Sequence, residues 1–441
     1  MQKKAIEIIR RLQENGFTAY FAGGYVRDLL LGIESKDIDI VTSARPEQVE
    51  KLFKKTLPIG KKFGIIIVVD GDDTFEVATF RKESDYTDNR RPGRIEFSEP
   101  EEDAKRRDFT VNGLFYDPIK KKVIDHVGGQ EDIKKKTIRF IGDADERIAE
   151  DHLRLVRAIR LKIELEFQYS PETFNAVRAN SSKIKDVSAE RVRDELIKIM
   201  KYKNRHTALV ELSESGLLAH VIPEIERLKG VPQPIEYHHE GDVFTHTYLA
   251  LKSLGEEASS HLGFAVLLHD IGKPPTLTHI KGKIVFHNHA QKSAEMAKAI
   301  LNRLKFSRFE TMDICWLIEN HMKIGQIDKM RPSKRLDFVL DPKFTDLIAL
   351  ARADASGTYP VSLEFTEKLE QDVKVALEFK SKTENLKKLS LIDGDDLVKL
   401  GLEPSAKFKE ILEDIEDRKV DSAISSKEQA IAYVKEKYIN V

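Results

Sequence analysis

The sequence of 441 residues contains one cysteine, Cys315, and no long apolar run. One thiol cannot close an internal disulfide or build a cysteine-rich zinc site, so we expect a reducing, cytoplasmic environment. No segment approaches the roughly 20 consecutive apolar residues of a membrane-spanning helix, and the residues after Met1 show no signal-peptide core. Low-complexity tracts and solenoid periods are also lacking. We therefore expect no membrane partner.

An excess of one charge is also lacking, because 73 lysines and arginines face 74 aspartates and glutamates. The chain as a whole therefore does not predict nucleic-acid binding, and an RNA surface would need locally clustered basic residues. Such clusters occur, for example at 105–107 and 134–136. The length, with 41% hydrophobic residues, predicts two to four domains that each bury a core.

The most informative stretch is a glycine pair followed by two acids. Gly23 and Gly24 lie between an apolar segment and a helical pattern over 25–31, and Asp37 and Asp39 follow in a predicted strand. Glycines allow a phosphate to approach the N–H groups at a helix start. Strand residues two apart share a face, so we predict that the two carboxylates lie side by side and hold Mg²⁺. The combination indicates nucleotidyl or phosphoryl transfer.

The surrounding pattern predicts a small mixed α/β head. Residues 3–15 have helical periodicity, 64–70 predict a buried strand, and 74–80 alternate as a second strand. Glu76 lies on that second strand, where it is either a third carboxylate near the metals or an exposed strand residue. Residues 81–100 are charged and lack apolar periodicity, so we predict a mobile loop there.

A second polar segment contains Arg106, Arg107, Asp108 and Asn112. The two arginines suit triphosphate oxygens, and the aspartate and asparagine suit ribose hydroxyls.

A third segment places Glu150 and Asp151 four and three residues before Arg154. On the continuous helix that we predict here, both acids share a face with the arginine and fix its geometry. Aspartate only accepts hydrogen bonds and arginine only donates them. Cytosine and adenine show an amino group beside a ring acceptor, whereas guanine and uracil show a carbonyl beside a ring N–H, so an Asp/Arg pair selects C or A. The alternative interpretation is an ordinary surface ion pair.

The C-terminal half contains a separate set of histidines and acids, in which His269 and Asp270 are adjacent, His246 lies upstream and Asp354 lies downstream. This arrangement is similar to that of HD phosphohydrolases. Imidazole and carboxylate groups together suit a divalent metal with water as the nucleophile. The four expected ligands of this HD site are His246, His269, Asp270 and Asp354. His289 and His321 are candidates for a second metal or a phosphate. The identity of the metal stays open.

The motifs GGxVRD at 23–28, DxDxxT at 37–42, RRDFTxNG at 106–113 and EDxxR at 150–154 together resemble the bacterial class II tRNA nucleotidyltransferase and poly(A) polymerase family. The resemblance covers nearly the whole chain. It departs at Gly113, a packing position where alanine is usual, and at Ala144, where proline is usual. Glu190, Arg191 and Glu195 resemble helices of that family that are mainly structural.

The resemblance implies an α+β fold with four parts: a nucleotidyltransferase head (1–135), a helical neck and body that selects nucleotide and binds RNA (136–232), an HD domain (233–380) and a small RNA-binding tail (381–441). The implied chemistry is a two-metal in-line nucleotidyl transfer. Its implied catalytic carboxylates are Asp37, Asp39 and Glu76, with two Mg²⁺ held by the first two. The implied nucleotide-binding residues are Gly23, Gly24, Arg27, Arg106, Arg107, Asp108, Asn112, Arg147, Glu150, Asp151, Arg154 and Arg157.

The implied activity is the addition of CCA to tRNA 3′ ends from CTP and ATP, without DNA as a partner. An A-adding enzyme or a poly(A) polymerase shares every one of these motifs and is the nearest alternative. Two further alternatives are an HD phosphohydrolase with a non-catalytic RNA-binding head and a non-catalytic RNA adaptor. If the HD site is active, the resemblance implies substrates related to RNA ends, such as 2′,3′-cyclic phosphates.

Overall fold

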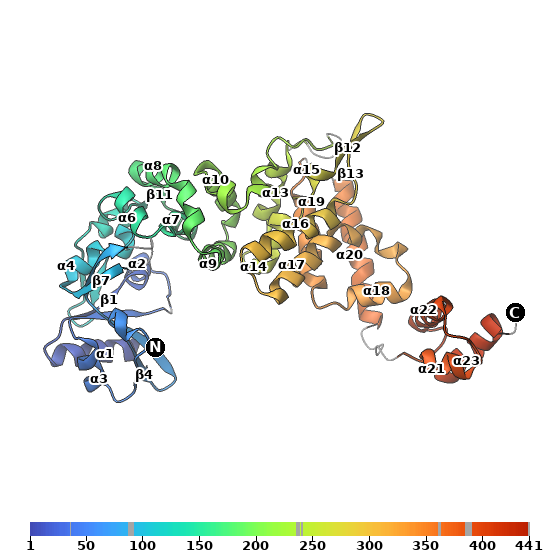
Figure 1. Cartoon of the computed structure of the whole chain (residues 1–441), viewed down its shortest axis with the longest axis horizontal. Helices are drawn as coiled ribbons and strands as arrows, with labels where there is room; N and C mark the ends of the chain where they lie inside the picture. The colour runs from blue at the N-terminus through green and yellow to red at the C-terminus, as the bar shows by residue number, and fades with distance from the viewer. Residues whose placement is uncertain are drawn as a thin grey trace. The chain divides into compact units, whose positions relative to one another are not determined.

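The computed structural model describes residues 1–35, 37–86, 92–234, 239, 241–359, 363–383 and 390–439. The chain forms two compact units, Met1–Pro223 and Glu224–Val441 (Figure 1). A mixed sheet lies in the first unit and helices dominate everything after it, so the predicted α+β class is confirmed. The finer boundaries at 135, 232 and 380 stay predictions.

The first unit is built on a seven-stranded sheet with the order β3-β4-β5-β2-β1-β8-β9. Its strands are β1 (Ala19–Ala22), β2 (Asp39–Thr42), β3 (Thr56–Leu57), β4 (Ile65–Asp70), β5 (Asp73–Thr79), β8 (Phe115–Asp117) and β9 (Lys122–Ile124). In the middle of the sheet β2 pairs antiparallel with β1 and parallel with β5. The central strands thereby bring residues from distant parts of the sequence to one place.

Helices around this sheet follow the predicted periodicity. α1 (Gln2–Glu14) buries Ala5, Ile8, Ile9 and Leu12, and it ends before Gly16, whose φ of 81° favours glycine. The other helices beside or within the head are α2 (Gly24–Leu31), α3 (Pro46–Leu52), α4 (Pro100–Lys105), the short 3₁₀ helix η2 (Thr110–Asn112) and α5 (Gly129–Lys134). At Gly113 an added Cβ would lie 2.7 Å from Val127 Cγ2, which agrees with a packing position.

Two local predictions for the head are wrong. In β4 only Ile66 and Val68 are buried, so the strand alternates and is not buried on both faces. The expected mobile loop contains two antiparallel strands, β6 (Arg81–Tyr86) and β7 (Pro92–Phe97). A charged sequence hides this hairpin because its order comes from backbone hydrogen bonds and not from an apolar face. The part of the prediction that falls on 87–91 lies outside the described residues.

The rest of the first unit is helical apart from a two-stranded ladder of β10 (Thr137–Ile138) and β11 (Gln168–Tyr169). Its helices are α6 (Ala144–Glu150), α7 (Arg154–Leu165), α8 (Pro171–Ala179), α9 (Ala189–Met200), α10 (Arg205–Glu214) and α11 (Leu218–Val221). Asp143 caps α6 by accepting a hydrogen bond from the Glu146 N–H at 2.9 Å, as the acidic helix start predicted. α7 packs against both α9 and α10.

The second unit consists mainly of helices. They are α13 (Val243–Ser253), α14 (Ser260–Leu268), α15 (Lys273–Thr276), α16 (His289–Arg303), α17 (Arg308–Asn320), α18 (Pro332–Val339), α19 (Phe344–Ser356), α20 (Leu363–Thr383), α21 (Gly394–Lys399), α22 (Ala406–Val420) and α23 (Lys427–Val434). β12 (Leu277–Ile280) and β13 (Lys283–Phe286) form a hairpin, and α12 (Pro223–Glu226) lies at the division between the units. None of the helices in the described residues is long and apolar enough to cross a membrane.

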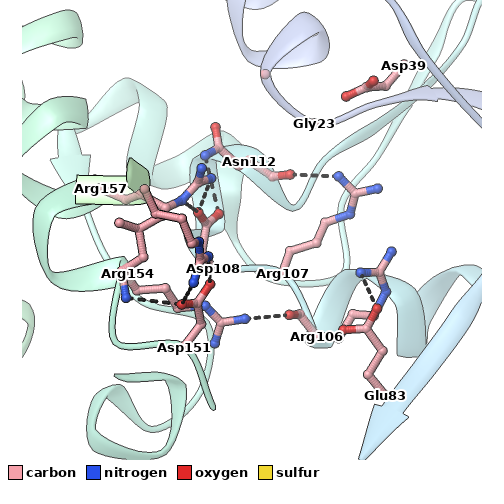
Figure 2. Close-up of a pocket in the computed structure, with 13 residues that line it drawn as sticks. Gly23, Asp39, Glu83, Arg106, Arg107, Asp108, Asn112, Asp151, Arg154 and Arg157 are labelled. Carbon is pink, nitrogen blue, oxygen red and sulfur yellow. Dashed lines mark hydrogen bonds and ion pairs between the residues drawn. The ribbon is translucent and has the colours of Figure 1, made fainter. Parts of the chain in front are cut away.

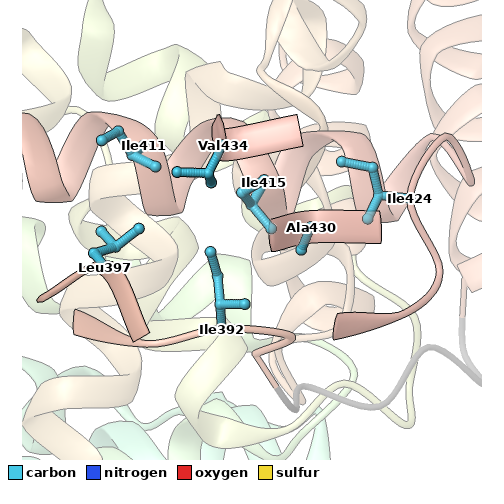
Figure 3. Close-up of a cluster of buried hydrophobic side chains, with 7 residues drawn as sticks. All are labelled: Ile392, Leu397, Ile411, Ile415, Ile424, Ala430 and Val434. Atoms are coloured by element: carbon cyan, nitrogen blue, oxygen red, sulfur yellow. The ribbon is translucent and has the colours of Figure 1, made fainter. Parts of the chain in front are cut away.

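The last three helices surround a hydrophobic cluster of their own (Figure 3). Its buried members are Ile392, Leu397, Ile411, Ile415, Ile424, Ala430 and Val434. The C-terminal segment therefore carries its own small core.

Candidate active site and metal centre

A polar cavity of about 330 Å³ lies beside the carboxyl-bearing end of β2 (Figure 2). It is lined by Gly23, Gly24, Asp39, Glu83, Arg106, Arg107, Asp108, Asn112, Asp151, Leu153, Arg154, Arg157 and Arg191. Four separate sequence motifs, at 23–28, 37–42, 106–113 and 150–154, thus contribute to one cavity.

Asp39 is the first residue of β2 and is the ladder partner of Glu76 on β5. Asp37 lies before the strand and is exposed, so the prediction that both aspartates share a strand is wrong. The reason is that Asp39 pairs with Ala22, the last residue of the antiparallel neighbour β1. The chain turns at Gly23, so the pairing with β1 does not continue to Asp37. The three acids nevertheless form one electrostatic cluster.

The negative charge of these three acids is not fully balanced by the neighbouring arginine. Burial of Asp39 and the negative charge of Asp37 raise the pKa of Asp39 to about 6, and Glu76 adds to the rise while Arg107 opposes it. An acid whose ionised form is penalised by neighbouring acids favours a bound cation. Carboxylate oxygens are the ligands that Mg²⁺ prefers in proteins.

Gly23 separates this cluster from the arginines. Its φ of 71° favours glycine, and an added Cβ would lie 3.1 Å from Arg107 Nη1 and 3.5 Å from Asp39 Oδ2. Gly24 begins the helix α2, as predicted, and both glycines line the cavity. The Gly23 N–H donates to the Leu114 main-chain oxygen at 3.2 Å, so an anionic group in the cavity would meet the helix start at the Gly24 N–H.

Arg106 and Arg107 share a buried anchor that the sequence did not indicate. Asp103 accepts from Arg106 Nη2 at 2.8 Å through one carboxylate oxygen and from Arg107 Nη2 at 3.2 Å through the other. Burial acts to raise the pKa of Asp103, but the two guanidinium groups outweigh it and lower that pKa. Spacings of three and four residues on α4 were the available signal.

Asp108 and Asn112 are held by cations from other elements. Arg157 donates to Asp108 Oδ2 from Nε at 2.8 Å, and Arg27 donates to Asn112 Oδ1 at 2.9 Å. Burial opposes ionisation of Asp108, but Arg157 and Arg154 outweigh it and hold the pKa of that carboxyl below its ordinary value. Arg27 itself is buried and pairs with Glu164 at 3.1 Å. The structure therefore places Arg27 behind Asn112 and outside the described lining of the cavity.

The predicted continuous helix through 150–154 is wrong. α6 ends at Glu150 and α7 begins at Arg154, and Asp151 between them has an extended backbone with φ −150°. The Asp151 carboxylate accepts from the Leu153 N–H at 3.1 Å, and this local hydrogen bond competes with the helix. Asp151 and Arg154 both line the cavity, as the sequence suggested, but each has a different partner.

Arg154 pairs with Glu150 at 2.6 Å and donates to the main-chain oxygens of Arg147 and Arg106. Arg147 also pairs with Glu150, at 2.5 Å, and neither of these two residues belongs to the described lining. Asp151 pairs instead with Arg191 of α9, a residue that the sequence reasoning treated as structural. A contact across 40 residues leaves no local signal.

A separate metal-ligating cluster lies in the second unit. His246, His269 and Asp354 form one group, and Asp270, His289 and His321 form another, with ligand atoms within 4.8 Å of one another in each. All six predicted HD-site residues are therefore brought together. Asp270 lies between the groups, with Oδ2 3.2 Å from His269 Nε2 and Oδ1 3.5 Å from His289 Nε2.

The imidazoles of this cluster have a common orientation. The Nδ1 atoms of His269, His289 and His321 lie 2.7, 3.0 and 2.6 Å from main-chain oxygens three residues earlier. With Nδ1–H donating there, each Nε2 faces the centre of the cluster. Burial opposes the charge of His269, but Asp270 and Asp354 outweigh it and raise the pKa of His269 to about 10, so a divalent cation bound there would replace the proton on its Nε2. His269 Nε2 is buried and lies 3.2 Å from Asp270 Oδ2 and 3.5 Å from Asp354 Oδ1. Burial and the neighbouring His269 lower the pKa of His321 to about 4, so it is neutral at pH 7. These donors fit a divalent cation, the kind of ion that HD domains generally use.

Comparisons with known proteins match different families to the part of the chain that forms the cavity and to the part that forms the metal-ligating cluster. Residues 19–139 match the family described as Poly A polymerase head domain, residues 166–229 match the probable RNA and SrmB-binding site of polymerase A, and residues 237–355 match the HD domain.

Two curated relatives are similar over part of the chain. A CCA-adding enzyme of Ligilactobacillus salivarius (strain UCC118) is 43% identical over 216 residues, which are 49% of this chain and 53% of the relative. A CCA-adding enzyme of Staphylococcus aureus (strain MRSA252) is 44% identical over 200 residues, which are 45% of this chain and 50% of the relative. These alignments thus span about half the length of the curated relatives.

One solved structure is similar over nearly its whole length. The crystal structure of the Bacillus stearothermophilus CCA-adding enzyme in complex with CTP has a TM-score of 0.72 and 27% identity, covering 99% of this chain and 97% of that chain.

Proposed function

We propose that this chain, a member of the nucleotidyltransferase family that carries the poly(A) polymerase head domain, adds CCA to the 3′ ends of tRNA from CTP and ATP. The observation that carries the proposal is that one cavity is bordered by two groups of residues, one suited to metal and phosphate binding and one suited to base selection. The acids around Asp39 adjoin the glycine turn at Gly23, and Asp151 and Arg154 line the same cavity.

In this proposal Asp37 and Asp39 hold Mg²⁺, with Glu76 close by on the neighbouring strand. The bound metal would activate the RNA 3′-hydroxyl and neutralise the leaving pyrophosphate. Arg106 and Arg107, anchored by Asp103, face the triphosphate together with the N–H group of Gly24, since the Gly23 N–H donates to the Leu114 main-chain oxygen at 3.2 Å. Their role is to bind and orient the phosphates for in-line attack.

Asp108 and Asn112 contact the ribose in this assignment. Arg157, which also lines the cavity, fixes Asp108, and Arg27 fixes Asn112 from behind. Asp151 accepts from the amino group of cytosine or adenine, and Arg154 donates to the neighbouring ring nitrogen. Glu150 and Arg147 orient Arg154 by ion pairing and by a main-chain hydrogen bond. Uracil and guanine present the opposite order of donor and acceptor and are rejected.

The test is incubation with tRNA that lacks its last three nucleotides, Mg²⁺ and each labelled nucleotide in turn. Incorporation of CTP followed by ATP, with a stop after three additions, supports the proposal. Incorporation of ATP alone, as one addition or as a long tail, would replace it with A addition or poly(A) synthesis. A head that binds no nucleotide would leave an RNA-binding module attached to an HD hydrolase.

A second activity is favoured by the cluster in the second unit. We propose that His246, His269, Asp270 and Asp354 bind one divalent metal and that His289 and His321, with Asp270, bind a second metal or a phosphate. Such a centre supplies a metal-activated water for hydrolysis of phosphate esters at RNA ends. Release of 2′-AMP or 3′-AMP from 2′,3′-cyclic AMP, lost in His269→Gln, would support it. Unchanged release in that variant would contradict the assignment.

The small tail is proposed as a further contact for tRNA. Its separate core, shown in Figure 3, would present a folded surface to the RNA.

A further inference from the structure

We propose that Arg191 of α9 is a positioning residue for base choice, because it holds the Asp151 carboxylate in one orientation inside the nucleotide cavity. The inference rests on the proposed nucleotidyltransferase function. It assigns a specificity role to a helix that the sequence indicated only as structural support.

The contact between the two residues is a two-pronged ion pair. Arg191 donates from Nη1 to Asp151 Oδ1 at 3.0 Å and from Nη2 to Asp151 Oδ2 at 2.7 Å. Both side chains are about four-fifths buried, with 21% and 19% of their surfaces exposed. A planar guanidinium that bonds both oxygens fixes the rotation of the carboxylate as well as its position. A lysine could supply the charge but not this geometry.

Asp151 needs an external anchor because of its place in the chain. It lies between α6 and α7 with an extended backbone, so helix geometry does not orient its side chain. Arg154, the cation expected from the sequence, is directed to Glu150 and to two main-chain oxygens. The guanidinium that the structure brings to Asp151 comes instead from α9.

The hydrogen bonds that the Asp151 carboxylate accepts from the protein determine how many acceptor sites are left for a base. An ionised carboxylate has about four acceptor sites. Arg191 uses two of them and the Leu153 N–H uses a third, which leaves one for an exocyclic amino group. Cytosine or adenine can donate to that site. The carbonyl of uracil or guanine would meet a lone pair that cannot rotate away, so a fixed carboxylate rejects it.

The helix that carries Arg191 is itself tied to the helix that begins at Arg154. Glu195, one turn after Arg191, is buried and accepts from Arg160 Nε of α7 at 2.6 Å. Val192 and Leu196 are buried on the same helix. Arg191 and Arg154 therefore stand on two helices of fixed mutual register, which sets the distance between the acceptor and the donor offered to a base.

The experiment compares Arg191→Met and Arg191→Lys with Arg193→Met in the full chain. Arg193 is a matched control because it lies on the same helix, pairs with the adjacent Asp194 at 2.7 Å and is not in the described lining of the cavity. The readouts are kcat/KM for CTP and UTP on tRNA lacking CCA, Kd for both nucleotides by calorimetry, and inhibition of CTP incorporation by pyrophosphate. Thermal melting checks that each variant is folded.

We expect Arg191→Met to reduce the preference for CTP over UTP by about tenfold or more, with inhibition by pyrophosphate changed less than about threefold. Arg191→Lys should fall between wild type and Arg191→Met, and Arg193→Met should match wild type. In an Asp151→Asn background the Arg191 substitution should add little to the loss of selectivity. If Arg191→Met is unstable, Arg191→Lys and the calorimetric preference decide the question.

Undiminished selectivity in a folded Arg191 variant would overturn the inference while leaving the proposed function intact. Equal loss of CTP binding, UTP binding and pyrophosphate inhibition would also overturn it, since that pattern indicates a general structural role. A wild-type chain that incorporates no CTP would instead refute the proposed function itself.

Discussion

The raised pKa of Asp39 predicts that the head loses affinity for Mg²⁺ as the pH falls through about 6. A protonated carboxyl does not ligate the metal, so proton and cation compete for the same oxygens. With a pKa of about 6, the ionised fraction falls from about nine-tenths at pH 7 to about one-tenth at pH 5, which weakens apparent binding about tenfold. An ordinary carboxyl with a pKa of 3.8 would stay more than about nine-tenths ionised at both values.

The assay is the binding of Mn²⁺, a spectroscopic substitute for Mg²⁺, followed by the electron paramagnetic resonance signal of the unbound ion. Full-length protein with His269→Gln and Asp354→Asn removes the contribution of the HD cluster. Asp39→Asn in the same background is the control and should bind Mn²⁺ weakly at both pH values. Equal affinity of the parent at pH 5 and pH 7, or an unchanged pH dependence in Asp39→Asn, would refute the reasoning.

Four further predictions concern Asp39 itself, the pair Asp151 and Arg154, and the core of the tail. Asp39→Asn should abolish nucleotide incorporation while RNA binding by gel shift persists. The same variant should stabilise the metal-free head at pH 7 by about 1 kcal/mol. The reason is that the pKa of Asp39 is higher in the folded than in the unfolded chain, so ionising Asp39 destabilises the fold increasingly as pH rises from 3.8 through about 6. Hydrogen exchange of β2 peptides measures this stabilisation. Replacing Asp151 by Asn and Arg154 by Met should loosen base choice more than triphosphate binding, measured as misincorporation of UTP and inhibition by pyrophosphate, and unchanged fidelity would contradict the protein template. Ile415→Ala removes a fully buried side chain from the tail core and should cost that core about 2–5 kcal/mol, lowering tRNA affinity but not metal uptake by the HD cluster; unaltered tRNA affinity in a variant with a melted tail would contradict RNA binding there.

Local signals predicted the elements that depend on local structure. The periodicity of α1, the glycine at the start of α2 and the strands β2 and β5 follow from short-range patterns, and the structure contains them all. The HD residues were recognisable because their side-chain chemistry is specific, and the fold brings them within ligating distance.

The differences arise where a single contact overrides a pattern. The hydrogen bond from the Leu153 N–H to Asp151 breaks the helix that spacing predicted. Arg27 sits in a signature motif, yet its ion pair with Glu164 of α7 turns it away from the cavity and toward Asn112. Such contacts join residues far apart in the chain, so no window of sequence contains them.

The most direct measurement of the central claim is the anomalous scattering of Mn²⁺ in crystals of the chain grown with CTP. We expect a peak within about 2.5 Å of carboxylate oxygens of Asp37 and Asp39 and in contact with the triphosphate. Carboxylates that face away from the ion, with CTP bound at another place, would contradict the account.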